Sequence, residues 1–157
     1  MKKLMLFAGL FCLHLSLLAG SISKPGITNM APVNASDRAK AHFSANYSEA
    51  RDAEWYSLPD RNMYCMFHQG KTVNRVFYDN RGYWQYTLLG YPVSGLNTEV
   101  KELVTDYFNG YRILYVNEIR SYKDAPVYMI NIENEDQTKL IKVTGDEIEQ
   151  QLSFKKS

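Results

Sequence analysis

The sequence of 157 residues contains little cysteine and little net charge. Its two cysteines are Cys12 and Cys65, and 18 basic residues nearly balance 17 acidic ones. Cys12 falls in an apolar N-terminal segment, which leaves Cys65 alone in the remainder. A single cysteine forms no internal disulfide and cannot complete a zinc site. The lack of a basic excess argues against nucleic-acid binding. Packing alone must therefore hold the fold, and we expect no cofactor and no metal.

Histidine is equally scarce, with only His42 and His68 outside the N-terminal segment. Neither has a second histidine at metal-ligand spacing. Cys65 and His68 lie three positions apart on one expected strand, so their side chains should point to opposite faces. With no convergent catalytic set, we expect a protein that is not an enzyme. A small thiol-dependent or hydrolytic enzyme built around Cys65 stays open as an alternative.

The N-terminal segment has the layout of a secretory signal peptide. Lys2 and Lys3 precede an apolar run over 4–19, and small residues follow, with cleavage expected just after Ser21 or Ser23. The run is shorter than a bilayer-spanning helix, which needs about 20 residues. No small residues precede Cys12, as they would in a lipoprotein signal. We assign 1–23 to the signal and expect a periplasmic or secreted protein with no membrane span after cleavage.

The rest of the chain suits one domain. Residues 24–36 are rich in Ser, Pro, Gly and Asn and are interpreted as a flexible leader to a domain over 37–157. Helices are expected from about 37 to 47 and from about 98 to 108. Turn residues separate the expected strands, which are 52–58, 63–68, 73–79, 83–89, 111–120, 127–133 and 139–144. The tail over 146–154 forms either a last edge strand or a frayed end.

The order of helix and strands occurs twice, over about 37–91 and 96–145, which predicts an internal duplication. An offset of 64 residues pairs several aromatic and apolar positions, and one extra residue near Asp136 raises it to 65. The pairs are Phe43 with Tyr107, Tyr47 with Tyr111, Glu54 with Glu118, Trp55 with Ile119, Tyr64 with Tyr128, Val76 with Ile141 and Tyr78 with Val143. This pattern predicts an α+β fold of two tandem units that form one curved antiparallel sheet, with the helices packed on one face.

Loop lengths decide which side chains share a face, because side chains alternate along a strand. A three-residue loop over 80–82 pairs Tyr78 with Trp84, and the same loop length over 69–71 pairs Phe67 with Val73. A two-residue turn at the second loop would shift the register by one. The expected core face is Trp55, Tyr64, Met66, Val76, Tyr78, Trp84, Tyr86, Leu88, Ile119, Tyr128, Ile130, Ile132, Ile141 and Val143. Asn74 is the one polar exception on this face.

The opposite, open face is expected to differ between the halves. In the second half it is an ordinary solvated surface of Glu118, Arg120, Met129, Asn131, Glu133 and Lys142. In the first half it carries surplus aromatic rings. The candidate binding residues there are Tyr56, Phe67, Arg75, Phe77, Tyr83 and Gln85, with Phe67, Arg75, Phe77 and Tyr83 as the main anchors.

These features together resemble the PepSY-like exported proteins, which are related in fold to the beta-lactamase inhibitory protein. The shared motifs are Phe43-x-x-x-Tyr47 at a helix end, Glu54-Trp55 at a strand start and Tyr78-Asp79-x-x-Gly82 in a hairpin. The resemblance covers about 37–145. It implies tandem helix-plus-sheet units with an open face, the face by which the inhibitory relative binds its enzyme. No inhibitory residue transfers to this chain, which also lacks that inhibitor's disulfides.

Surplus aromatic residues on an open face indicate a contact surface. We therefore expect a binding module that takes a protein or peptide on the open sheet face. A homodimer that closes this face on itself stays open as an alternative.

Overall fold

The computed structural model describes residues 34–156, so the expected signal peptide and most of the leader lie outside the described residues. The first half contains α1 (Asp37–Asn46), β1 (Arg51–Ser57), β2 (Met63–Gln69), β3 (Thr72–Tyr78) and β4 (Trp84–Tyr91). A short 3-10 helix, η1 (Val93–Gly95), leads to the second half. That half contains α2 (Thr98–Tyr107), β5 (Arg112–Ser121), β6 (Val127–Glu133), β7 (Gln137–Thr144) and β8 (Glu147–Lys155).

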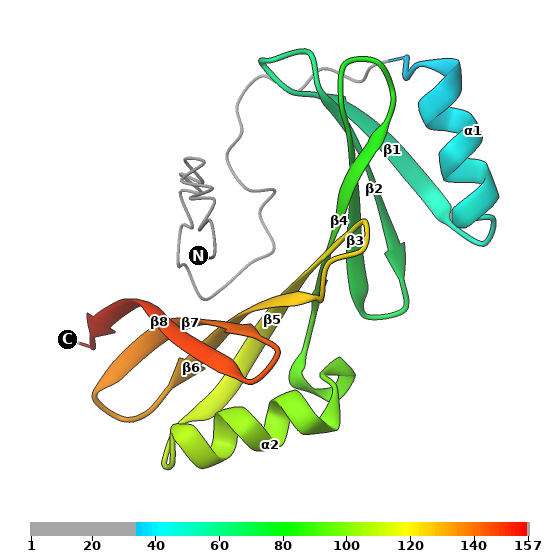
Figure 1. Cartoon of the computed structure of the whole chain (residues 1–157). Helices are drawn as coiled ribbons and strands as arrows, with labels where there is room; N and C mark the ends of the chain where they lie inside the picture. Colours follow the sequence, from blue (N-terminus) through cyan, green and yellow to red (C-terminus); the bar gives the residue numbers. More distant parts are fainter. Residues whose placement is uncertain (1–33, 157) are drawn as a thin grey trace, which may run out of the picture.

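The eight strands form one open antiparallel sheet in which each strand pairs with its neighbours in sequence (Figure 1). The expected α+β class is therefore confirmed, with an antiparallel eight-stranded sheet and two helices. Strand boundaries lie within a few residues of the expected ones, because turn residues mark them clearly. The tail forms an edge strand, β8, paired with β7, rather than a frayed end.

Both helices begin at a side-chain cap that satisfies free backbone N–H groups. Ser36 Oγ accepts a hydrogen bond from Ala39 N at 3.3 Å, and Asn97 Oδ1 accepts one from Glu99 N at 2.8 Å. The residue before each cap, Ala35 or Leu96, is buried. Each cap therefore fixes a helix start, and the buried residue beside it ties that start to the core.

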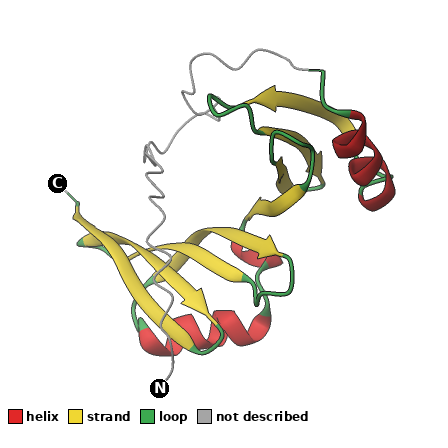
Figure 2. Ribbon diagram, turned by 45° about the horizontal axis from the view of Figure 1, so that its top comes forward, coloured by secondary structure: helices red, strands yellow, loops and turns green. Residues whose placement is uncertain are grey.

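Both helices pack on the same face of the sheet, which we call the helix face. On β4 the side chain of Thr87 reaches Tyr47 at the end of α1, with 2.9 Å between the hydroxyl oxygens, and Leu89 packs into the core under α2. Residues two apart on a strand share a face. Figures 1 and 2 show the sheet bent, with the helices on the outer side of the bend. The face opposite the helices is the open face.

The core consists of two clusters of different composition. Under α1 it is mainly aromatic, with Phe67 and Tyr78 almost fully buried and Phe43, Tyr47 and Trp55 packed around them. Under α2 it is mainly aliphatic, and its fully buried members include Val104, Val116, Ile130, Ile132, Ile141 and Val143. Tyr107 is 68% exposed, so its expected equivalence with the packed Phe43 is wrong.

The hairpin between β3 and β4 follows the expected three-residue loop. Asp79 N donates to the carbonyl oxygen of Tyr83 at 2.9 Å, and Tyr78 pairs with Trp84. Gly82 has a φ of 81°, and a Cβ there would lie 2.2 Å from Ser36 Oγ. Only glycine meets both conditions, and the hairpin therefore packs closely on the start of α1.

The hairpin between β2 and β3 differs from the expected one. Its loop has two residues, because Gln69 pairs with Thr72, and Gly70 at its first position has a φ of 60°. Glycine with positive φ at this position is typical of a type II′ turn. The shorter loop moves the register by one residue and so turns β2 over. Phe67 and Cys65 therefore face the helices, while Tyr64 and Met66 lie on the open face, which corrects the expectation for Phe67, Tyr64 and Met66.

A second correction concerns β5, where the pairing with β6 shifts between Ile113 and Tyr115. This bulge changes the phase of the strand. Glu118 therefore lies on the helix face and is 4% exposed, whereas Ile119 pairs with Leu88 and Val127 on the open face. The expected core positions of Ile119 and Leu88 are both wrong.

Candidate functional site

The open face of the first half carries an unbroken row of four aromatic rings, Tyr56, Tyr64, Phe77 and Tyr86, which we call the aromatic ladder. These residues are direct cross-strand partners on β1 to β4. Successive ring centroids lie 5.0, 5.2 and 4.5 Å apart, with interplanar angles of 20°, 29° and 19°. Such cross-strand stacking adds about 0.5–1.5 kcal/mol for each pair beyond the area that it buries. The ladder therefore supports itself without a helix above it.

Two of the ladder residues, Tyr64 and Tyr86, were expected in the core. The register change on β2 brings Tyr64 to the open face. Tyr86 comes there because β4 has one extra residue opposite the step from Phe77 to Tyr78, so that Phe77 pairs with Tyr86 instead of Gln85. The signal for Tyr64 was present in the sequence, since Gly70-Lys71 suits a two-residue turn. Nothing in the sequence marked the extra residue on β4.

Tyr56, the ladder residue on the edge strand β1, is hydrogen-bonded to an acidic residue. The Tyr56 hydroxyl donates a hydrogen bond to the Glu54 carboxylate, two positions earlier on β1. This hydrogen bond is the largest cause, and burial the second, that raises the pKa of Tyr56 to about 12. At neutral pH the phenol is protonated and remains a donor. The ladder therefore ends in a fixed polar group at the sheet edge.

Arg75 lies beside the ladder on the same face, between Met66 on β2 and Leu88 on β4. Burial raises the pKa values of Tyr64 and Tyr115, and the positive charge of Arg75 opposes both shifts. Its positive charge thus acts on both phenols. Within 34–156, Arg75 forms no ion pair with a carboxylate. The open face therefore combines stacked rings with an unneutralised cation.

Among the residues expected at the site, the structure brings Tyr56, Arg75 and Phe77 together and separates the others. Phe67 is 2% exposed and packs against Phe43 in the core, with ring centroids 5.4 Å apart. Its placement on the open face is wrong, because β2 is turned over.

Tyr83 and Gln85 also lie apart from the ladder. The Tyr83 ring is exposed, and the guanidinium carbon of Arg38 on α1 lies 4.1 Å from its centroid. Gln85 is the extra residue on β4, and its amide donates to the carbonyl oxygens of Tyr83 and Trp84 at 3.2 and 3.5 Å. Both side chains thus have local partners around the β3–β4 turn.

Cys65 has the properties of a core residue. It is completely buried on the helix face, and burial raises the pKa of its thiol to about 12. A nucleophilic cysteine requires access and a lowered pKa. His68 lies on the opposite face of β2, as expected. Within the described part of the chain, no group of three or more His, Cys, Asp or Glu side chains is placed to hold a metal ion.

The chain is similar to several solved structures. A DUF2874 family protein of Bacteroides ovatus has a TM-score of 0.60 at 16% identity, covering 76% of this chain and 86% of that one. A candidate periplasmic protein of Bacteroides eggerthii gives 0.62 at 16% identity over 76% and 89%. A BLIP-like protein of Bacteroides fragilis gives 0.62 at 10% identity over 78% and 87%. No family model and no curated protein sequence matches the chain.

At these identities the similarity concerns the fold alone. The name BLIP-like refers to the beta-lactamase inhibitory protein, so the fold agrees with that part of the sequence resemblance. Within residues 34–156, no helix combines the length and apolar character that a membrane crossing needs.

Proposed function

We propose that this protein is a non-enzymatic binding module that holds a protein or peptide on the open face of its sheet. The contact residues are Tyr56, Phe77 and Tyr86 of the aromatic ladder together with Arg75. The observation that carries the proposal is the stacked ladder itself, a continuous aromatic row on the face that neither helix covers.

The ladder has the physical properties of a contact surface. Aromatic and arginine side chains contribute most of the binding energy in protein interfaces. Rings already held by stacking lose little conformational freedom when a partner binds, which leaves more of the contact energy for affinity. Tyr56, Arg75, Phe77 and Tyr86 are each half-buried, so part of each side chain remains available.

The comparisons are consistent with this proposal. The similar solved structures include a BLIP-like protein and a candidate periplasmic protein. We therefore also propose a periplasmic or secreted location. We propose that the two halves are copies of one PepSY-like unit, because each begins with a capped helix and continues with four antiparallel strands.

The test compares partner capture from a cell-envelope extract by the wild-type protein and by the variant Tyr56→Ala/Phe77→Ala/Tyr86→Ala. Each truncated anchor should cost about 2 kcal/mol of binding energy or more, so the triple variant should retain none of the specific partner. The matched control is Tyr107→Ala, which removes an exposed tyrosine from α2. It should capture the partner as well as the wild-type protein does.

Equal capture by the triple variant and the wild-type protein would refute the open face as the binding surface. Light scattering of the purified protein tests the homodimer alternative. A dimer that dissociates in the triple variant but not in Tyr107→Ala would identify the partner as a second copy of this chain.

A further inference from the structure

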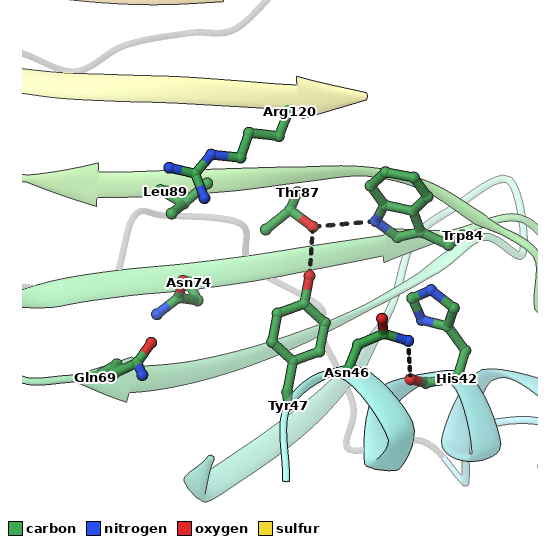
Figure 3. Close-up of a pocket in the computed structure, with 9 residues that line it drawn as sticks. All are labelled: His42, Asn46, Tyr47, Gln69, Asn74, Trp84, Thr87, Leu89 and Arg120. Atoms are coloured by element: carbon green, nitrogen blue, oxygen red, sulfur yellow. Dashed lines mark hydrogen bonds between the residues drawn. The ribbon is translucent and has the colours of Figure 1, made fainter. Parts of the chain in front are cut away.

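A cleft of about 330 Å³ opens on the helix face, between the last turn of α1 and strands β2 to β5 (Figure 3). It lies where the cover of the two helices leaves a gap, between the aromatic core under α1 and the aliphatic core under α2. Tyr47, Trp84 and Leu89 contribute apolar and aromatic walls. The cleft is on the opposite side of the sheet from the aromatic ladder.

The floor of this region is unusually polar for the space between two cores. Four polar or charged residues are buried in the described part of the chain. Three of them, Asn74, Thr87 and Glu118, are neighbours on the helix face of β3, β4 and β5. Burying a polar group costs free energy unless a hydrogen bond compensates for it. Any of these three side chains that lacks a partner within the protein is therefore a candidate contact for a ligand.

Two of the three buried polar side chains have partners within the protein. Thr87 Oγ1 accepts a hydrogen bond from Trp84 Nε1 at 3.1 Å. Its second contact, with the Tyr47 hydroxyl, is drawn with the first in Figure 3. Glu118 accepts hydrogen bonds from the Tyr91 hydroxyl and from Arg120 Nε, both at 2.5 Å. Neither residue needs a ligand.

Asn74 differs from them. Its side chain lines the cleft and the residue is only 3% exposed, yet its Nδ2 has no hydrogen-bond partner in the described part of the chain. An unpaired buried donor costs about 1–3 kcal/mol, and such groups are rare in folded proteins. The amide hydrogens therefore lack an acceptor among the described residues.

Arg120 supplies a second set of donors. Glu118 occupies its Nε, while no described residue accepts a hydrogen bond from its two terminal nitrogens. Its side chain is 57% exposed, and Figure 3 shows it reaching over β4 from the neighbouring strand β5 toward the side where Asn74 lies. Nine described residues line the cleft, and none of these nine is Asp or Glu. The lining therefore favours an anionic acceptor over a cation.

We propose that this cleft binds a carboxylate. The oxygens accept hydrogen bonds from Asn74 Nδ2 and from the terminal nitrogens of Arg120, a geometry for which guanidinium groups are well suited. An apolar or aromatic group attached to the carboxylate lies against Trp84, Tyr47 and Leu89. The carboxylate belongs to a free small acid, to a peptide C-terminus or to an acidic side chain. This site is independent of partner binding on the open face.

The experiment is a titration of the ¹⁵N-labelled protein with benzoate, followed by two-dimensional amide and indole spectra. Benzamide, which has nearly the same shape and no charge, is the matched ligand control. We expect saturable shifts of the Trp84 indole and the Asn74 side-chain amide with benzoate, and at least tenfold weaker binding of benzamide. Arg120→Gln should weaken benzoate binding about tenfold or more, because it removes charge-assisted hydrogen bonds.

Two further variants control for effects on folding. Arg112→Gln removes another arginine of β5 that also pairs with a glutamate, Glu133, and should bind benzoate as the wild-type protein does. Asn74→Leu removes the unpaired donor and keeps Arg120, so it tests the site even where Arg120→Gln disturbs Glu118. It should also weaken benzoate binding about tenfold.

The source of the carboxylate is tested with two peptide pairs: Ala-Ala-Phe against its C-terminal amide, and acetyl-Ala-Glu-Ala-amide against its glutamine counterpart. Tighter binding of the first member of a pair identifies a C-terminal or a side-chain carboxylate, respectively. Benzoate binding without either preference identifies a free small acid. Equal shifts with benzoate and benzamide, unchanged affinity in both cleft variants, or shifts confined to the open face would overturn the proposal.

Discussion

The two halves of the molecule contain the same sequence of elements but differ in what covers their strands. In the first half, aromatic rings occupy both faces, in the core under α1 and in the ladder on the open face. In the second half the core is aliphatic, and the open face presents residues such as Asn117, Met129 and Lys142, the last paired with Glu149 at 3.4 Å. The comparison shows that one backbone plan carries a continuous aromatic row on the open face of one half and a mixture of polar and aliphatic side chains on that of the other.

The largest effect should come from truncating either core. Phe67→Ala and Ile130→Ala remove side chains that are at most 2% exposed, and each should lower the free energy of unfolding by about 2–5 kcal/mol. Phe77→Ala, in the half-buried ladder, should cost about 1–2 kcal/mol, because its ring contacts remain partly open to solvent. Chemical denaturation of the three variants measures this order. A greater loss for Phe77→Ala than for Phe67→Ala would mean that β2 and β3 have the opposite faces.

The next effect separates two glutamates that the sequence repeat had made equivalent. Glu118 is buried and accepts hydrogen bonds from Tyr91 and Arg120, whereas Glu54 is exposed beside Tyr56. Glu118→Ala should cost about 1–3 kcal/mol, because it leaves the Tyr91 hydroxyl unpaired, and Glu54→Ala about 0.5 kcal/mol or less. Urea denaturation of both variants is the measurement. Similar losses would restore the equivalence of the two positions.

A smaller effect of opposite sign is expected at Asn74. Asn74→Leu removes the unpaired Nδ2 and should raise the free energy of unfolding by about 1 kcal/mol. Asn117→Leu, on the open face of β5, should change it by less than about 0.5 kcal/mol. Thermal and chemical denaturation test both. A destabilised Asn74→Leu variant would show that the amide serves the fold rather than a ligand.

The smallest effect concerns pH. Burial lowers the pKa of His42, whose Nδ1 lies 3.1 Å from the Tyr78 hydroxyl oxygen. In the unfolded chain this histidine has a pKa of about 6.5. As the pH falls, the unfolded state therefore takes up a proton at a higher pH than the folded state does. The contribution of neutral His42 to the free energy of unfolding is therefore fully present above about pH 6.5, and it is lost as the pH falls through the lowered folded-state pKa.

The pH test compares unfolding midpoints at about pH 7.5 and about pH 5.5 in the wild-type protein and in His42→Gln. The decrease toward the lower pH should be smaller in the variant. Asp79 and Glu133 also have lowered pKa values, because of hydrogen bonds from the Tyr83 backbone and from Lys156, respectively. Their ordinary values are 3.8 and 4.5, so their losses fall at lower pH. Equal decreases would exclude His42 as the cause.

The sequence was sufficient to predict the helices and strands. It was not sufficient to predict which face of the sheet the side chains of each strand occupy. Capping residues and turn residues act locally, so the helices, the strands and the Gly82 hairpin were predictable. Register depends on single residues, and each error reverses a whole strand. One residue fewer in the loop at Gly70 turned β2 over, and one extra residue on β4 exchanged Gln85 for Tyr86. The bulge after Ile113 brought Glu118 into the core, against the hydrophobic pattern.

The candidate site was predictable only in part for the same reason. Tyr56, Arg75 and Phe77 lie on strands whose faces were correctly assigned, and they lie on the open face as expected. Tyr64 and Tyr86 were missed because their strands change phase. The cleft depends on the gap between two cores, which no short motif records, although Asn74 already stood out as the polar residue on an apolar face.

The most direct test of the central claim, that the aromatic ladder is the contact surface, is site-specific photo-crosslinking in the cell envelope. A photoreactive phenylalanine analogue replaces Tyr86 in the ladder or, in the control, Tyr107 on α2. The account predicts a discrete crosslinked product from position 86 and none of the same mass from position 107. The same product from position 107 alone would contradict it, since the partner would then bind the side of the molecule that carries the helices.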